Sequence, residues 1–213
     1  MIAIIDYGVG NLFSLKSSLA QLGQDTVVTA DPDTIRKADR LILPGVGAFG
    51  DAMDKLVATG LVPVIRAEAE KKPLLGICLG MQMLFDESEE FGLHKGLGLI
   101  PGRVVKIPST DVQGRPQKVP HISWNPLNPA GGRTDFAGTV LAGVTPGEEC
   151  YFIHSYEAKP ADEADRLADT VYGGRAVCAA AAHGSVVGCQ FHPEKSGKVG
   201  LKIIEEYMKR AEK

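Results

Sequence analysis

Short runs of apolar and β-branched residues alternate with helical segments in the first half of the chain, and this alternation constrains the fold most. Each run is four residues long, and together they span Ile2–Ile5, Thr26–Thr29, Arg40–Leu43 and Leu74–Ile77. Strands of this kind, separated by helices, are typical of a parallel sheet that is covered on both faces. We therefore expect an α/β fold with a mostly parallel central sheet flanked by helices.

Helical spacing separates these runs. Leucines three to four residues apart predict a helix over Leu12–Leu22, with Asn11 as its N-cap. Further helices are expected over Asp51–Thr59, over Val62–Lys71, from Met81 to Phe85 and over Val199–Lys213.

The second half of the chain changes to an antiparallel character. Strands between short polar, glycine or proline turns are expected at Arg103–Ile107, Val140–Leu141, Tyr151–Glu157, Leu167–Tyr172, Ala176–His183 and Val186–Phe191. The stretch AHGSVV between the last two strands has the composition of a tight hairpin turn. No low-complexity linker interrupts the sequence, so residues 1–213 are expected to form one domain.

Composition and charge argue against several classes of function. The net charge is −3, so the chain lacks the excess of positive charge that is typical of proteins that bind nucleic acid or an anionic membrane. No apolar stretch approaches the roughly 20 residues of a membrane-spanning helix. The four cysteines lack CxxC spacing and the histidines lack metal-ligand spacing, so we expect a cytoplasmic protein without a metal site.

A cysteine between two glycines follows the fourth run, in the sequence GICLG at residues 76–80. Where a parallel strand turns sharply into a helix, the corner residue is lifted into the region where ligands gather. The corner backbone is strained and nearby side chains would clash, so flanking glycines suit it. This is the pattern of a nucleophile elbow, with Cys78 in place of serine. The alternative is a buried cysteine in an ordinary strand-to-helix turn.

The segment GCQFHPEKSG contains a candidate base for such a thiol and a group to orient that base. Pro193 is expected to keep the chain extended, and side chains two apart on an extended segment point the same way. The Glu194 carboxylate is then expected beside the His192 ring, where it would fix the tautomer and stabilise an imidazolium. A His-Pro-Glu sequence alone is more common as a surface turn, but with a cysteine elbow it indicates a catalytic triad.

Two further glycine-containing loops follow the first and third runs. The loop Pro44–Gly47 is expected at the same sheet edge as the elbow, with its backbone free to approach a ligand. The sequence Gly8–Gly10, with Asp31 after the second run, matches part of a dinucleotide-binding fingerprint. Phe13 stands where that fingerprint requires its third glycine, so no nucleotide cofactor is expected.

Taken together, these motifs resemble those of the class I glutamine amidotransferases. The stretches that carry the resemblance span nearly the whole chain in order: IIDYGVGNLFS, LPGVGAFGDAM, GICLGMQMLF, VPHISWN, YFIHSYEA and GCQFHPEKSG. The DYGVGN start and the WNP loop favour the branch of the family that serves histidine biosynthesis. One departure is Ser123, where family members usually have glycine before Trp-Asn.

The resemblance implies a fold, a reaction and a set of site residues. The fold is the flavodoxin-like class I amidotransferase domain, and the reaction is glutamine hydrolysis by a triad of Cys78, His192 and Glu194 without a cofactor. The N–H groups of Val46 and Leu79 are implied as the oxyanion hole. The residues implied to hold glutamine are Gly45, Gly47, Gln82, Ser155 and Tyr156. Those implied to lie near a subunit interface are Asn11, Trp124, Asn125, Tyr151 and Lys195.

The resemblance also implies a partner, because released ammonia is useful only if it reaches an acceptor. We expect a (β/α)8-barrel cyclase subunit to receive the ammonia and to bind the phosphorylated nucleotide that accepts it. We further expect the backbone N–H of Val46 to point away from the site until this partner has docked and bound its nucleotide. Three alternatives stay open: the glutaminase of another amidotransferase, a stand-alone cysteine hydrolase, and a non-catalytic activating subunit.

Overall fold

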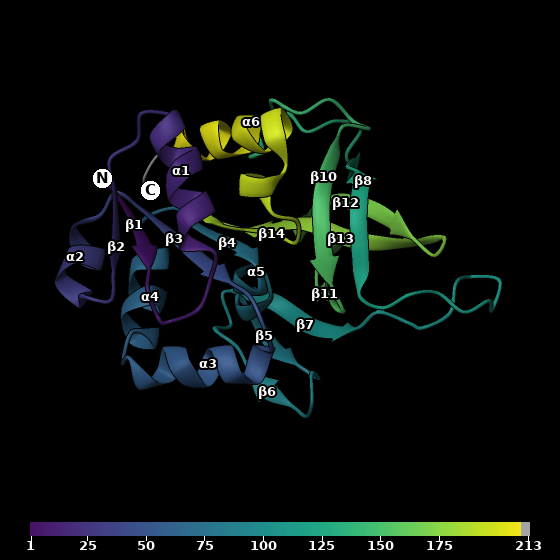
Figure 1. Cartoon of the computed structure of the whole chain (residues 1–213), viewed down its shortest axis with the longest axis horizontal. Helices are drawn as coiled ribbons and strands as arrows, with labels where there is room; N and C mark the ends of the chain where they lie inside the picture. Colours follow the sequence, from purple (N-terminus) through teal and green to yellow (C-terminus); the bar gives the residue numbers. More distant parts are fainter. Residues whose placement is uncertain (210–213) are drawn as a thin grey trace.

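The computed structural model describes residues 1–209, and an eight-stranded sheet runs through this part of the chain (Figure 1). Its strand order is β2-β1-β3-β4-β14-β13-β12-β9. The parallel strands are β1 (Ile2–Ile5), β2 (Thr26–Thr29), β3 (Arg40–Gly45), β4 (Leu74–Cys78) and β14 (Val186–Cys189). The antiparallel strands are β13 (Arg175–His183), β12 (Arg166–Tyr172) and β9 (Asn128–Pro129). The expected mostly parallel first half and antiparallel second half are both confirmed.

Helices cover both faces of the parallel strands, because successive side chains of a strand point to opposite faces and here both sets are apolar. Ile2 and Ile4 belong to the core that α1 and α6 cover, whereas Ala3 and Ile5 belong to the core under α2, α3 and α4. Figure 1 shows α1 and α6 on one side of the sheet and α3 and α4 on the other. The helices are α1 (Leu12–Gln21), α2 (Pro32–Lys37), α3 (Phe49–Ala58), α4 (Val62–Ala69) and α6 (Gly197–Met208).

Two smaller sheets complete the described part of the fold. One has the order β11-β7-β5-β6, and the other pairs β10 with β8. Their strands are β5 (Phe85–Ser88), β6 (His94–Lys95), β7 (Ile100–Lys106), β8 (His121–Pro126), β10 (Glu149–His154) and β11 (Tyr156–Pro160). The expectation of one strand over Tyr151–Glu157 was therefore wrong. The chain breaks at Ser155 because the two halves pair with different partners, β8 and β7.

Two further expectations about secondary structure were wrong. The segment from Met81 to Phe85 is not one helix, because α5 (Leu79–Met83) ends and Phe85 then pairs with Ile100 of β7. Val140–Leu141 lies in a turn rather than a strand, although both side chains are fully buried. A two-residue apolar segment can bury its side chains without joining a sheet, so apolarity alone does not identify a strand.

The ends of the helices differ from the sequence-based expectations in detail. Asn11 occupies the expected N-cap position of α1, but its side chain makes no capping bond to the helix backbone and donates to the Ser14 hydroxyl instead. The helix α2 was not expected, although Asp31 caps it by accepting from the Thr34 N–H at 2.8 Å. Asp31 therefore has a structural role that explains its place after β2. The final helix begins at Gly197, and residues 210–213 of its expected range lie outside the described residues.

The hairpin between β13 and β14 is confirmed, with Gly184 at φ +61°. No helix within residues 1–209 is long and apolar enough to cross a membrane.

Candidate active site

Cys78, at the end of β4, occupies the strained corner that its flanking glycines predict. Its backbone has φ 53° and ψ −112°, a conformation that residues other than glycine seldom adopt. A Cβ on Gly76 would lie 2.7 Å from the Gly80 carbonyl oxygen, and a Cβ on Gly80 would lie 1.9 Å from the Leu43 carbonyl oxygen. The strands and α5 thus pack backbone against backbone around the corner, which is possible only with glycine at both positions.

His192 and Glu194 form a buried pair, as the sequence predicts, but the backbone between them has a different conformation from the one expected. His192 is extended, whereas Glu194 lies in a 3-10 turn, Pro193–Lys195, so the expectation of an extended segment was wrong. The turn nevertheless places Glu194 Oε1 at 2.8 Å from His192 Nδ1, with both side chains only 3% exposed. Burial works to lower the pKa of His192, but hydrogen bonds with Cys78 and Glu194 outweigh it and raise this pKa to about 9.

The raised pKa of His192 predicts a pH-dependent stability. Because its pKa of about 9 in the folded state lies above the ordinary value of 6.5, His192 stabilises the fold fully below pH 6.5 and loses this effect as pH rises through about 9. The effect amounts to about 3 kcal/mol. We expect the free energy of unfolding, measured by urea titration, to fall by this amount relative to His192→Asn across that range. Equal pH dependence of the two proteins would contradict this account.

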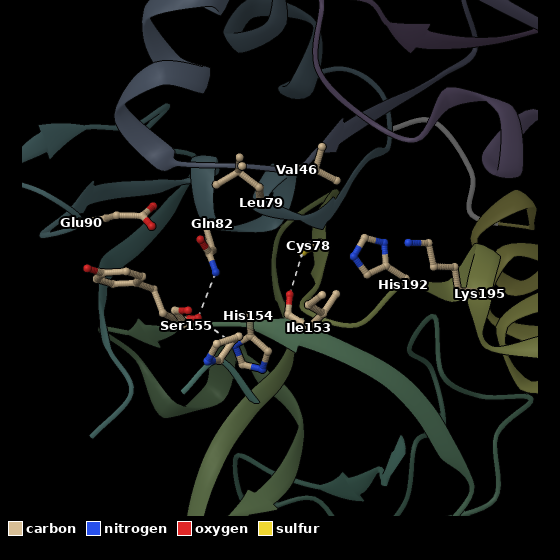
Figure 2. Close-up of a pocket in the computed structure, with 13 residues that line it drawn as sticks. Val46, Cys78, Leu79, Gln82, Glu90, Ile153, His154, Ser155, His192 and Lys195 are labelled. Atoms are coloured by element: carbon tan, nitrogen blue, oxygen red, sulfur yellow. Dashed lines mark hydrogen bonds between the residues drawn. The ribbon is translucent and has the colours of Figure 1, made fainter. Parts of the chain in front are cut away.

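The Cys78 sulfur contacts two groups besides His192. In the resting thiol, the S–H points to the Ile153 carbonyl oxygen at an S–O distance of 3.8 Å, drawn as a dashed line in Figure 2. The amide Nε2 of Gln190 donates to the sulfur from 3.9 Å. His192, whose raised pKa favours the imidazolium, also interacts with the sulfur, and a positively charged ring beside a sulfur favours the nucleophilic thiolate once the S–H proton is lost.

A pocket of about 330 Å³ opens at the elbow, which is a volume suited to a small molecule. It brings together most of the residues singled out from the sequence: Val46, Gly47, Cys78, Leu79, Gln82, Ser155, Tyr156, His192 and Lys195. It is also lined by residues that were not singled out from the sequence: Glu90, Pro120, Ile153 and His154. Glu194 does not line the pocket, because it lies behind His192 as its hydrogen-bond partner.

Gly45 lies beneath the elbow rather than on the pocket wall. It pairs with Cys78 in the β3–β4 register, and a Cβ on it would lie 2.7 Å from the Gly80 nitrogen. Because Gly45 and Cys78 are register partners, the peptides that follow them, at Val46 and Leu79, emerge at the same edge of the sheet. Val46 and Leu79 both line the pocket, so the two expected oxyanion donors lie on residues of the same site.

The loop after Gly45 is fixed at its start and turns sharply at its end. The buried Tyr7 hydroxyl donates to the Pro44 carbonyl oxygen at 2.7 Å. Gly47 has φ +99°, which glycine adopts without strain. Val46, between them, is 42% exposed.

Glu90 places a carboxylate at the opposite end of the pocket from Cys78 (Figure 2). Its Oε2 accepts from the backbone N–H of Phe49 at 2.7 Å, at the first residue of α3. The pocket therefore has a thiol and an imidazole at one end and an acidic group, suited to an ammonium, at the other. No motif marks Glu90 in the sequence, because its place in the site depends on the packing of the β5–β6 loop against α3.

The residues expected near an interface divide into a cluster and two separate positions. The rings of Trp124 and Tyr151 lie 6.0 Å apart, and Lys195 Nζ lies 6.0 Å from the Tyr151 ring centroid. Trp124 is 50% exposed, so it is not a core residue. Asn125 donates to the Val171 carbonyl oxygen, whereas Asn11 lies near the start of α1. The cluster stands beside the catalytic candidates, since Tyr151 is 6.5 Å from the His192 ring.

His121 and His154 form a buried pair, with His121 Nδ1 at 3.0 Å from His154 Nε2. Among the described residues, no group of histidine, cysteine, aspartate and glutamate side chains is arranged to hold a metal ion. Cys150, Cys178 and Cys189 are buried, and burial raises the pKa of Cys150 and of Cys178 to about 12.

The fold and the elbow define the class of the protein, and comparison with known proteins agrees. The chain belongs to the class-I glutamine amidotransferase family, whose model matches residues 3–210. Its relatives include imidazole glycerol phosphate synthase subunit HisH 1 of Legionella pneumophila (strain Lens), 46% identical over 97% of this chain and 98% of the relative. Subunit HisH of Geobacillus kaustophilus is 50% identical over 98% of this chain and 96% of the relative.

Solved structures of lower identity share the fold. A glutamine amidotransferase crystal structure matches with a TM-score of 0.71 and 18% identity, over 98% of this chain and 100% of that chain. The structure of PurLQS from Thermotoga maritima matches with a TM-score of 0.68 and 19% identity, over 97% of this chain and 96% of that chain.

Proposed function

We propose that this chain is the glutaminase subunit of imidazole glycerol phosphate synthase, and that it supplies ammonia for histidine biosynthesis. The observation that carries the proposal is the cysteine on a strained elbow beside a buried histidine–glutamate pair, in a pocket of small-molecule size. The relatives named HisH, 46–50% identical over nearly the whole chain, support the particular pathway. Residues 1–213 then act as one amidotransferase domain.

The first half of the reaction releases ammonia. The Cys78 thiolate attacks the side-chain carbonyl carbon of glutamine, and the carbonyl oxygen becomes an oxyanion that accepts from the N–H groups of Val46 and Leu79. The C–N bond then breaks, and the nitrogen leaves as ammonia with a proton from the His192 imidazolium. A γ-glutamyl thioester on Cys78 remains.

The second half restores the enzyme. His192 accepts a proton from water, whose oxygen attacks the thioester carbonyl. The C–S bond breaks, glutamate leaves, and Cys78 returns to the thiolate. Glu194 holds the imidazole tautomer through its bond to Nδ1 and stabilises the charged ring in both halves.

The pocket suits the rest of the substrate as well. Glu90 provides a carboxylate for the α-ammonium group of glutamine. Gln82, Ser155 and Tyr156 line the wall between Glu90 and the nucleophile, and Gly47 lines the wall beside Val46. Gly45 supports the loop from beneath instead of touching the substrate.

The ammonia is delivered to a separate (β/α)8-barrel cyclase subunit, which binds the nucleotide substrate. The exposed Trp124 and its neighbours Tyr151 and Lys195 form the part of the docking surface on one side of His192, together with Asn125, and Asn11 adjoins His192 from the start of α1. The unpaired state of all four cysteines is consistent with a reducing cytoplasm. In the isolated chain, we expect the Val46 N–H to point away from the oxyanion position.

Glutamate release tests the proposal in three mixtures: the chain alone, the chain with the cyclase, and the chain with the cyclase and its nucleotide. Since one oxyanion donor is worth about 10²–10³ in turnover, stimulation of that size is expected when the partner is loaded. A rate of hydrolysis that is equal with and without the partner would point to another glutaminase. Absence of hydrolysis in all three mixtures would favour a non-catalytic subunit.

Replacement of Glu194 by glutamine tests the triad. The isosteric amide keeps the shape of the site but removes the charge that supports the imidazolium, so we expect turnover in the loaded complex to fall about 10²–10⁴-fold. Glu205→Gln, on the exposed face of α6, is the matched control and should leave turnover unchanged. An active Glu194→Gln enzyme would remove Glu194 from the triad.

A further inference from the structure

Two buried glutamine side chains connect the pocket wall to the Cys78 sulfur. Gln190 directly follows β14 and is fully buried, and Gln82, on α5, is 4% exposed. Gln82 Nε2 donates both to the Tyr156 carbonyl oxygen and to Gln190 Oε1, each at 3.0 Å. Gln190 Nε2 in turn donates to Cys78 Sγ at 3.9 Å. Gln190 has no part in the mechanism derived above.

This chain of hydrogen bonds fixes which end of each amide faces the sulfur. The Tyr156 carbonyl oxygen can only accept, so Gln82 must present its NH₂ group there. The second hydrogen of that NH₂ group points to Gln190, which must therefore offer its oxygen. The NH₂ group of Gln190 is then left to face Cys78. A flip of either amide would place two donors or two acceptors together in the interior, which is costly.

Besides the His192 ring, which favours the thiolate when it is charged, the sulfur contacts two neutral groups that favour opposite protonation states. The Ile153 carbonyl oxygen accepts the S–H of the thiol but repels a thiolate. The Gln190 N–H, in contrast, donates to sulfur and is attracted most strongly when the sulfur is charged. The Gln190 contact is buried, and hydrogen bonds in the interior are stronger than in water, whereas the Ile153 contact is only partly buried.

We propose that Gln190 is a positioning residue for the nucleophile: its amide N–H holds the Cys78 sulfur and stabilises the thiolate, and Gln82 anchors that amide to the pocket wall. The inference rests on the proposed function insofar as Cys78 is the nucleophile. It adds that the wall facing the substrate and the reacting sulfur share one chain of hydrogen bonds, through Gln82, which lines the pocket.

The pH dependence of Cys78 alkylation by iodoacetamide tests this inference in the full-length chain, with the modified site read by mass spectrometry. Gln190→Met keeps a similar volume but has no donor. At about pH 7 we expect its alkylation rate to be about tenfold below wild type. The midpoint of the rise with pH should move up by about one unit, and the rates should converge at high pH, where every thiol is ionised. A role in packing alone would change the rate equally at all pH values.

Control variants separate this effect from background and from misfolding. Cys78→Ala measures alkylation at the three other cysteines, which are buried. Gln190→Asn keeps the amide one methylene short of the sulfur and should show the same displaced midpoint if the methionine variant does not fold. Gln113→Met, at an exposed site, should match wild type.

Midpoints equal to wild type in the folded Gln190 variants, or a change that is uniform over pH, would overturn the inference. The two proposals fail separately. If the alkylation midpoint is displaced but the chain never releases glutamate, the proposed function is wrong, while Gln190 remains a hydrogen-bond donor to the Cys78 thiolate. If the chain releases glutamate but the alkylation midpoint of the Gln190 variants equals that of wild type, only the proposed role of Gln190 is wrong.

Discussion

Replacing Cys78 by alanine is expected to abolish glutamate release by the loaded complex, with a fall of at least about 10⁴-fold. The reaction depends on a covalent thioester, and no other side chain of the pocket can take over, because a nucleophile and its base act as a unit. The variant should still fold, since alanine meets the same backbone strain at φ 53° as cysteine does. It should therefore still bind the cyclase and glutamine, and binding is best measured by calorimetry beside the activity assay.

The matched control for this prediction is Cys178→Ala. Cys178 is 1% exposed and does not line the pocket, so its loss should cost some stability but little turnover. Substantial glutamate release by Cys78→Ala would show that the elbow is not the reacting centre.

Replacing Gly80 by alanine is expected to destabilise the fold by about 3 kcal/mol or more. Alanine gains only about 1 kcal/mol of helix propensity over glycine, which works in the opposite direction. The steric effect is larger because the new Cβ would lie 1.9 Å from the Leu43 carbonyl oxygen, which is backbone and cannot rotate away. A fall in the urea midpoint measures the effect, and turnover should fall too, since α5 would have to move away from β3.

Gly143→Ala is the control for this second prediction. Its Cβ would lie 3.5 Å from the nearest atom, the Lys202 Cβ, which is an ordinary contact. A Gly80→Ala protein as stable as Gly143→Ala would mean that the elbow does not need its close backbone packing.

The sequence predicts those parts of the site that depend on local geometry. The elbow around Cys78 and the His192–Glu194 pair are encoded within a few residues each, so their chemistry is visible without a structure. The parallel strands are equally local, because each one is a short run made mostly of apolar or β-branched residues.

Features that depend on contacts distant in sequence were not predicted. The break at Ser155 arises because β10 and β11 pair with strands from two different regions, and nothing within Tyr151–Glu157 marks it. Gln190 stands inside a recognised motif, yet its role depends on Gln82, more than a hundred positions away in the chain. The helix α2 is different, because its start is local: Asp31 is the N-cap and Pro32 follows at the first helical position.

Glu90, the proposed partner of the substrate's ammonium group, also bonds to the start of α3. The same carboxylate lines the pocket and accepts from the first residue of α3, so its replacement alters both at once. For protein engineering, this makes Glu90 a poor first choice for admitting a different amino acid, because an exchange for any residue without a side-chain oxygen leaves the N–H of Phe49 without its acceptor. Libraries that vary Ser155, at the strand break, separate selectivity from stability better.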